Sequence, residues 1–306
     1  MQITFEELNA LPLAVVRKIL PGWVAAHVTD ETVRLRLQGE LEALLGAVPE
    51  PDLVALRSTF MVAGDAWRFH PADPIARALT RLYMNELVTT QAFEHPERLR
   101  RFLDSGPPRR IIIGNHLSYT DTQVTDRAFV TAGFPAAADR LVAIAGPKVY
   151  TDPWRRLAAI SLHTRKTPQS NVVATEQDAL SPRELAVVAF AAIDECVSLT
   201  DQGYIPLLYP EGARSRSGHV RPFLRASARY LQQPDMQILA MAQTGTEHIF
   251  PIGEAVMTPG PVRIAFAEPF CAADYPGKTG PIIEAHRRLA AMLPEAYRPE
   301  TDEVLA

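Results

Sequence analysis

A histidine and an aspartate lie five residues apart in the segment GNHLSYTD, residues 114–121, directly after the apolar run at 111–113. A neutral imidazole accepts a proton from an attacking hydroxyl when a carboxylate holds its other ring nitrogen and stabilises the imidazolium that forms. A strand that turns into a helix over this spacing would bring His116 and Asp121 together. Ser118 followed three residues later by Asp121 also fits a capping box, in which Asp121 only closes a helix end.

A second polar segment, YIPLLYPEGARSRSG at 204–218, also follows an apolar run and carries Glu211, Gly212, Arg214 and Arg216. Guanidinium groups bind phosphate through two parallel hydrogen bonds, and the amides of a turn add further donors. These residues therefore indicate an anion-binding pocket. In the alternative interpretation the arginines lie in a solvated loop, Glu211 pairs with an arginine or caps the next segment, and Gly212 supplies an unusual backbone angle.

Two further segments have less specific patterns. In SLHTRKTPQSN, residues 161–171, His163, Arg165 and Lys166 place three potential cations close together. Like charges repel, so both an anion-binding role and simple exposure on a loop are open interpretations. The segment 248–262 is apolar and rich in proline, which fits either the lining of an acyl-chain tunnel or ordinary core packing.

From residue 110 onward the pattern favours an α/β fold with a mainly parallel mixed sheet flanked by helices, because short apolar runs alternate with helical stretches. Ser181, Pro182 and Glu184 mark one helix start as cap, first-turn proline and capping-box partner. The expected strands cover 110–113, 140–145, 159–163, 204–209, 236–242 and 262–267. The expected helices cover 120–132, 153–158, 183–200, 221–232 and 280–293.

Residues 1 to about 100 are expected to be mostly helical, because apolar residues recur there at three- and four-residue spacing between prolines. Leu37, Leu41 and Leu45 belong to one such row. We therefore expect a smaller N-terminal helical domain over 1–80 and an α/β catalytic domain over 81–306.

Length and composition exclude several classes of protein. The 306 residues carry a formal net charge of −4, so no overall field favours nucleic acid. Two cysteines, Cys196 and Cys271, form neither a disulfide framework nor a CxxC zinc pair, and we expect no metal. The N-terminus lacks a signal-peptide pattern, and no apolar run approaches the roughly 20 residues of a membrane span, which favours a cytoplasmic protein. The sequence contains no G-x-S-x-G elbow, P-loop, G-x-G-x-x-G or H-E-x-x-H motif.

The order of the first two segments resembles the glycerolipid acyltransferase family, in which an N-H-x-x-x-x-D block precedes a P-E-G-x-R-S block. The stretches AGPKVYTDPWRRLAAISLHTRK and EAVMTPGPV, with a helical part before them, are similar to the soluble, plastid-type glycerol-3-phosphate acyltransferases. The resemblance implies a general base at His116 oriented by Asp121, acceptor-phosphate ligands at Arg214 and Arg216, further phosphate-binding cations at Arg165 and Lys166, and an acceptor site shaped by Glu211 and Gly212. The plastid-type enzymes tend to vary this Glu-Gly pair, so its presence here leaves the acceptor open.

The same resemblance implies transfer of a fatty acyl group from acyl-ACP or acyl-CoA to a hydroxyl of glycerol 3-phosphate in phospholipid biosynthesis. We expect direct transfer without an acyl-enzyme or another cofactor, because neither cysteine lies in a candidate motif. The alternatives are lysophosphatidate or a specialised hydroxylated acceptor, and a catalytically silent lipid- or carrier-binding protein. Expected partners are acyl carrier protein or a CoA thioester and a phosphorylated glycerol, with no nucleic acid. The apolar and basic stretch 11–28 adds peripheral contact with the inner membrane face as an expectation.

Overall fold

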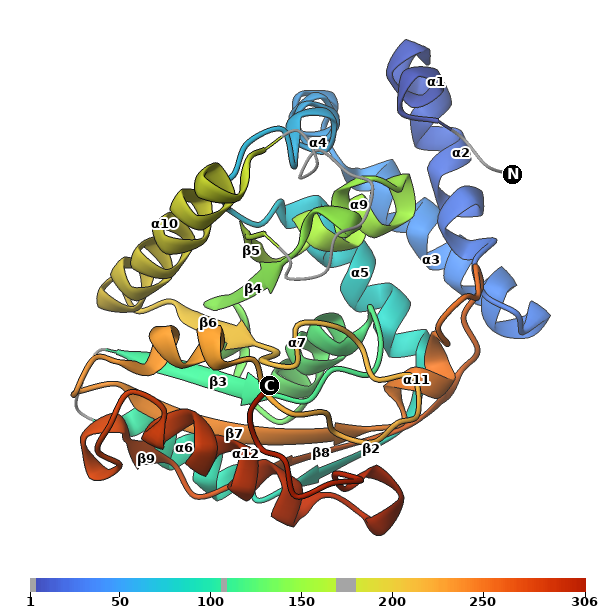
Figure 1. The fold of residues 1–306 in the computed structure, drawn as a ribbon. Helices are drawn as coiled ribbons and strands as arrows, with labels where there is room; N and C mark the ends of the chain where they lie inside the picture. Colours follow the sequence, from blue (N-terminus) through green and yellow to red (C-terminus); the bar gives the residue numbers. More distant parts are fainter. Residues whose placement is uncertain (1–3, 106–108, 169–179) are drawn as a thin grey trace.

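The computed structural model describes residues 4–105, 109–168 and 180–306, and Figure 1 shows its helices arranged around a central sheet. The helices are α1 (Phe5–Ala10), α2 (Leu13–Ala25), α3 (Glu31–Ala47), α4 (Glu50–Val62), α5 (Pro74–Leu87), α6 (Pro96–Asp104), α7 (Asp121–Thr131), α8 (Pro135–Ala138), α9 (Pro153–Ile160), α10 (Pro182–Asp201), α11 (Thr246–Ile249) and α12 (Gly280–Met292). The 3₁₀ segments are η1 (Pro147–Tyr150), η3 (Arg225–Leu231), η4 (Ala272–Asp274) and η5 (Glu295–Tyr297). The strands are β1 (Phe69–His70), β2 (Val88–Glu94), β3 (Arg110–Gly114), β4 (Leu141–Ala145), β5 (His163–Lys166), β6 (Ile205–Leu208), β7 (Gln237–Thr244), β8 (Gly260–Phe266) and β9 (Phe270–Cys271).

The strands of the described residues form one nine-stranded sheet in the order β1-β5-β4-β6-β3-β7-β8-β2, and β9 pairs with β7. Strands β5, β4, β6, β3 and β7 run parallel to their neighbours in this order. β8 is antiparallel to β7, and β1 is antiparallel to β5. The sheet is therefore mixed and mainly parallel, which confirms the predicted α/β class.

Strand β3 lies at the centre of the sheet and is buried on both faces. Ile112 belongs to one buried hydrophobic cluster, whereas Ile111 and Ile113 belong to another. This split follows from the period of two residues along a strand. A strand covered on both faces reads as a continuous apolar run, which explains why the sequence predicted β3 well.

The helices before residue 88 pack on the first of these two clusters. Leu37, Leu41 and Leu45 of α3 are fully buried in the same cluster as Ile112 of β3 and Leu239 of β7. The predicted domain boundary at residue 80 stays a prediction.

The start of α10 is the one that the sequence predicts. The Ser181 side chain accepts a hydrogen bond from the Glu184 N–H, the Glu184 carboxylate accepts one from the Ser181 N–H, and Pro182 stands in the first turn. These local bonds satisfy two otherwise free donors at the helix end, so the boundary can be read from neighbouring residues.

Three expectations about secondary structure are wrong. The expected strand at 159–163 is the end of α9, because the Asp152 side chain caps that helix and the helix continues to Ile160 before β5 begins at His163. The expected helix at 221–232 is the shorter 3₁₀ segment η3. Residues 88–94, expected to be helical, form the edge strand β2, whose residues are largely exposed or half-buried and so carry no apolar alternation.

Candidate active site

His116 lies in the loop that joins the carboxyl end of β3 to the first turn of α7. The carboxyl ends of parallel strands are where open α/β sheets bind ligands. Two anchors fix this loop: the Ser118 hydroxyl donates to the Phe250 carbonyl (3.0 Å), and Asn115 and Gln243 exchange hydrogen bonds between the loop and β7.

The His116 ring and the Asp121 carboxylate are bonded, as the spacing predicts. His116 Nδ1 lies 2.7 Å from Asp121 Oδ2, which requires the proton on Nδ1. The same oxygen accepts the backbone N–H groups of Leu117 (2.7 Å) and Ser118 (3.0 Å), while the other oxygen accepts the Thr246 hydroxyl (2.5 Å). Asp121 therefore fixes the loop and the ring at once, and its side chain does not cap α7.

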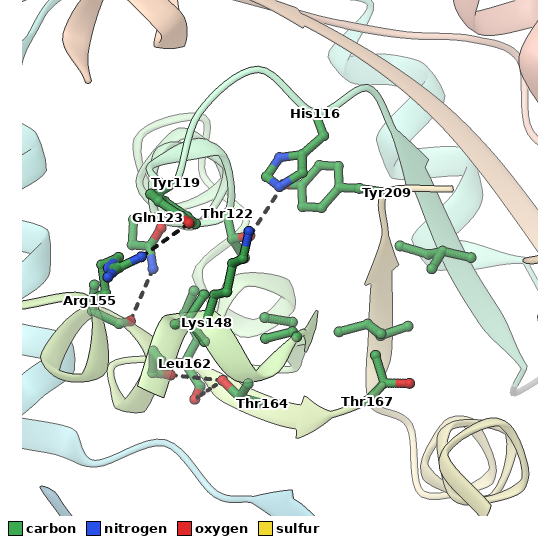
Figure 2. Close-up of a pocket in the computed structure, with 18 of the residues that line it drawn as sticks. His116, Tyr119, Thr122, Gln123, Lys148, Arg155, Leu162, Thr164, Thr167 and Tyr209 are labelled. Atoms are coloured by element: carbon green, nitrogen blue, oxygen red, sulfur yellow. Dashed lines mark hydrogen bonds between the residues drawn. The ribbon is translucent and has the colours of Figure 1, made fainter. Parts of the chain in front are cut away.

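The aromatic ring of Tyr209 stacks against the His116 ring. The two ring centroids are 4.6 Å apart with an interplanar angle of 14°, and Figure 2 shows the parallel rings above the cavity. A Cβ at Gly114 would lie 3.0 Å from the Tyr209 ring, so a glycine at the end of β3 leaves the room that this stacking needs. Stacking and the bond to Asp121 together hold the plane of the imidazole.

Glu211 ties the two motif loops together from inside the protein. Its carboxylate accepts the His116 backbone N–H (2.7 Å) and the Arg221 backbone N–H (3.0 Å), and the residue is 2% exposed. Burial raises the pKa of Glu211 to about 8, against the lowering effect of these two N–H donors. The Ser215 N–H also donates to the His116 carbonyl (2.7 Å), and Gly212 adopts a positive φ of 70° in the turn between them.

The two arginines predicted as phosphate ligands lie in different environments. The Arg214 guanidinium carbon lies 3.6 Å from the centroid of the Tyr119 ring, and burial lowers the pKa of Arg214. Arg155 contacts the same tyrosine by donating to its hydroxyl (3.1 Å). Arg216, in contrast, is exposed to solvent. Arg214 is thus held against a neighbouring ring, but neither arginine is among the described residues that line the cavity beside His116.

Arg165 and Lys166 are buried in β5. Each of the two residues is 1% exposed. Arg165 forms an ion pair (2.5 Å) with Glu195 of α10, whose side chain is 38% exposed. The Lys166 ammonium donates to the Gly64 carbonyl and lies 4.5 Å from the centroid of the Trp67 ring. Neither side chain is among the described residues that line the cavity, whereas the neighbouring Thr164 and Thr167 are.

A cavity of about 460 Å³ opens beside His116. Its lining is largely apolar and comes from two sides, α10 with the segment 224–230 on one and α2, α5 and α9 on the other (Figure 1). Phe250 and Met257 of the predicted proline-rich segment line it and also belong to the buried core, and the role of that segment in an acyl-chain tunnel stays a prediction.

Sequence reasoning assigned no catalytic role to Lys148, which lines the same cavity. Figure 2 shows its side chain pointing toward the His116 ring. Lys148 follows the carboxyl end of β4 by three residues, at the edge of the sheet where β3 places His116. That position after a parallel strand was the available signal for Lys148. Tyr209 and Thr246 likewise follow the carboxyl ends of β6 and β7, but no local pattern identified their partners, which are distant in the sequence.

The described residues contain no group of three or more histidine, cysteine, aspartate or glutamate side chains arranged to hold a metal ion. In the same part of the chain, no helix has the length and apolar character needed to cross a bilayer.

Comparisons with known proteins agree with this arrangement. The model of the acyltransferase family matches residues 92–244, which is 153 of 306 residues or half of the chain. The fold is similar to that of the 1-acyl-sn-glycerophosphate (LPA) acyltransferase PlsC from Thermotoga maritima, with 15% identity, 91% of each chain covered and a TM-score of 0.50. No curated protein sequence matches the chain. The protein therefore belongs to the acyltransferase family of enzymes, in agreement with the resemblance that its paired motifs carry.

Proposed function

We propose that the protein transfers a fatty acyl group from an acyl thioester to a hydroxyl of glycerol 3-phosphate, with His116 as the general base. The observation that carries this proposal is the bonded His116–Asp121 pair at the opening of an apolar cavity. Because Nδ1 is bound to Asp121, the basic nitrogen is Nε2, on a ring whose side chain is 21% exposed. A binding protein needs no such oriented base.

The reaction then runs in two steps without an acyl-enzyme. His116 Nε2 takes the proton of the acceptor hydroxyl while that oxygen attacks the thioester carbonyl carbon and forms a tetrahedral intermediate. The intermediate collapses, the carbon–sulfur bond breaks, and the leaving thiolate takes the proton from the imidazolium. Asp121 stabilises the imidazolium between the two steps.

Two cations, Lys148 and Arg214, support the binding of negative charge. The Lys148 ammonium points toward the ring, where an oxyanion or a phosphate would lie (Figure 2). A pre-organised donor at an oxyanion contributes about 2.7–4 kcal/mol in known enzymes. Arg214, held on the Tyr119 ring beside Arg155, is positioned to bind the acceptor phosphate and to orient its hydroxyl.

Lysophosphatidate is the second candidate acceptor, and the extent of the apolar cavity lining supports it. Apolar residues line the cavity on two sides, from α10 and from α5 with α9. The acyl chain of the donor occupies one side only. An acceptor that carries its own acyl chain would use the other, whereas glycerol 3-phosphate would not.

An acyl-transfer screen tests the proposal. The purified protein is given acyl-CoA or acyl-ACP with glycerol 3-phosphate, lysophosphatidate or glycerol, and thiol release and acylated product are both measured. We expect product from a phosphorylated acceptor and little from glycerol. Equal rates with glycerol would remove the phosphate site, and thiol release without acylated product would indicate a thioesterase. Product from lysophosphatidate alone would select the second candidate.

A further inference from the structure

The first half of α10 is apolar around its whole circumference. Residues 185–193, LAVVAFAAI, are nine consecutive apolar residues, yet Ala192 is the only one of them that is buried. A helix that is apolar all round normally lies inside a protein core or in lipid. This half of α10 lies at the side of the molecule (Figure 1).

The two flanks of this half-helix have different neighbours. Leu185, Ala189 and Ile193 line the cavity beside His116. Val187 is 62% exposed and Phe190 is 47% exposed, so the opposite flank presents large apolar side chains to the surroundings. The helix thus separates the apolar cavity, which one flank lines, from the apolar surface that the other flank forms.

The chain next to this wall is basic. Residues 212–234 contain five arginines and no aspartate or glutamate, although the whole protein carries a net charge of −4. Arg225 and Arg229 of η3 are exposed, and the Arg229 guanidinium carbon lies 4.2 Å from the centroid of the Phe190 ring. Within the described ranges, the ion pairs include neither of these two arginines. Their charges are therefore available to an anionic partner.

We propose that the α10–η3 face, formed by Val187, Phe190, Arg225 and Arg229, docks on the surface of an anionic lipid bilayer. Apolar side chains flanked by arginines are the pattern of interfacial helices, which place their apolar flank at the boundary of headgroups and acyl chains. An acidic protein could also bind the two arginines. A protein interface, however, carries about one hydrogen bond per 100–200 Å², and the apolar part of this face would have to supply some of them. The side chains of 185–193 offer none.

This proposal concerns a property beyond the reaction and places membrane contact at α10. The stretch 11–28, which the sequence suggested for that contact, forms α2 and packs against α3, with Leu20, Pro21, Val24 and Ala25 buried. Docking through α10 would set the wall of the cavity against the bilayer, so that an acyl chain moves between the two past one helix.

Vesicle flotation tests the proposal. The full chain is mixed, without any substrate, with vesicles of phosphatidylcholine or of phosphatidylcholine with phosphatidylglycerol. We expect binding to the anionic vesicles that weakens with added salt, since exposed charges are screened. The double variant Arg225→Gln/Arg229→Gln should bind about twenty- to thirty-fold more weakly, given the usual contribution of basic residues at a membrane surface. Val187→Asp/Phe190→Asp should lose binding to a similar extent or more.

Two controls match the tested residues in exposure and contact. Leu35→Asp changes an α3 residue that is 62% exposed, like Val187, and Arg100→Gln changes an arginine that lies over Phe134 as Arg229 lies over Phe190. Both controls should bind vesicles as the unchanged protein does. Thermal unfolding checks that each variant is folded, and the single variants Phe190→Ser and Arg229→Gln replace any double variant that is not.

Three results would overturn the proposal. They are absence of binding to anionic vesicles, equal losses in the controls, and unchanged vesicle binding in both double variants. In the last case, a raised KM for acyl-ACP in the same variants would assign the face to an acidic carrier protein. Binding is measured without substrate, so none of these results depends on whether the protein transfers acyl groups as proposed.

Discussion

The loops that carry His116 and Arg214 and the strand that carries Arg165 and Lys166 are both rich in polar residues but differ in what holds them. The two loops follow the ends of parallel strands, where His116 lines the cavity and Arg214 lies on the Tyr119 ring. Arg165 and Lys166 lie within β5 and are buried, where Arg165 pairs with the half-exposed Glu195 and Lys166 donates to a carbonyl beside an aromatic ring. Charge clustered in a sequence therefore indicates a binding site only when strand ends expose it.

The largest expected effect is the loss of kcat on replacing His116, which lies in one of the two loops. His116→Ala should lower kcat about 10³-fold or more, because general-base catalysis alone contributes about 10²–10⁴-fold and no other described residue replaces the ring. The KM for the acceptor should change little. Steady-state kinetics at saturating acceptor measures this loss.

His219→Ala is the matched control for this substitution, since His219 is a half-buried loop histidine bonded to the Arg298 carbonyl. It should retain nearly full activity. If His116→Ala kept more than a tenth of the rate, the ring would not be the base, and the oriented pair would serve only to fix the loop.

The other side of the comparison predicts a loss of stability. Arg165→Met should lower the free energy of unfolding by about 1.5–3 kcal/mol, the usual contribution of a hydrogen bond to a charged group, because water solvates the half-exposed Glu195 that remains. The KM for the phosphorylated acceptor should stay near that of the unchanged protein. Urea denaturation and acceptor titration measure the two quantities separately.

The control is Arg183→Met, which changes an exposed arginine of α10, the helix that carries Glu195. It should change neither the free energy of unfolding nor the acceptor KM. A tenfold rise in acceptor KM for Arg165→Met without loss of stability would reverse the comparison. It would restore the phosphate-binding role that the family resemblance implied for Arg165 and Lys166.

The features that local sequence determines were predicted well. The buried run before His116 and the Ser181 capping box define β3 and the start of α10 through residues within a few positions of each other. The His116–Asp121 bond belongs to the same class, because both residues lie in one turn.

The features that were missed depend on distant partners. β2 joins the sheet through β8, which lies about 170 residues further along, and its own residues are too exposed to show an apolar pattern. Thr246 contacts Asp121, and Glu195 pairs with Arg165, across separations that no local pattern encodes. The burial of Arg165 was unpredictable for this reason.

Glu211 provides a test of how firmly the two loops are joined. Its folded pKa of about 8 lies above the ordinary value of 4.5, so the folded protein binds more protons than the unfolded chain between these values. The free energy of unfolding should therefore fall as pH rises from about 5 to 8, by roughly 2–4 kcal/mol. Glu211→Gln cannot ionise, so this fall should disappear in the variant, although the loss of one acceptor lowers its stability at every pH.

Urea denaturation at several pH values compares how the free energy of unfolding changes with pH in the unchanged protein and in the variant. Parallel curves would mean that the carboxyl is ionised throughout.

The smallest expected effect comes from two arginines of one loop, which differ in position but not in charge. Arg214→Ala should raise the acceptor KM about ten- to thirty-fold, the usual loss for a charge-assisted hydrogen bond to phosphate. Arg216→Ala should raise the acceptor KM by no more than about threefold, because the exposed guanidinium is screened by water and salt. Initial rates across acceptor concentrations, with the acyl donor saturating, measure both values of KM.

The family motif alone assigns both arginines to the phosphate, whereas the structure holds Arg214 against the Tyr119 ring and leaves Arg216 exposed. Equal effects would mean that the loop closes over the acceptor and brings Arg216 in, and an effect on the acyl donor alone would move the phosphate site away from Arg214.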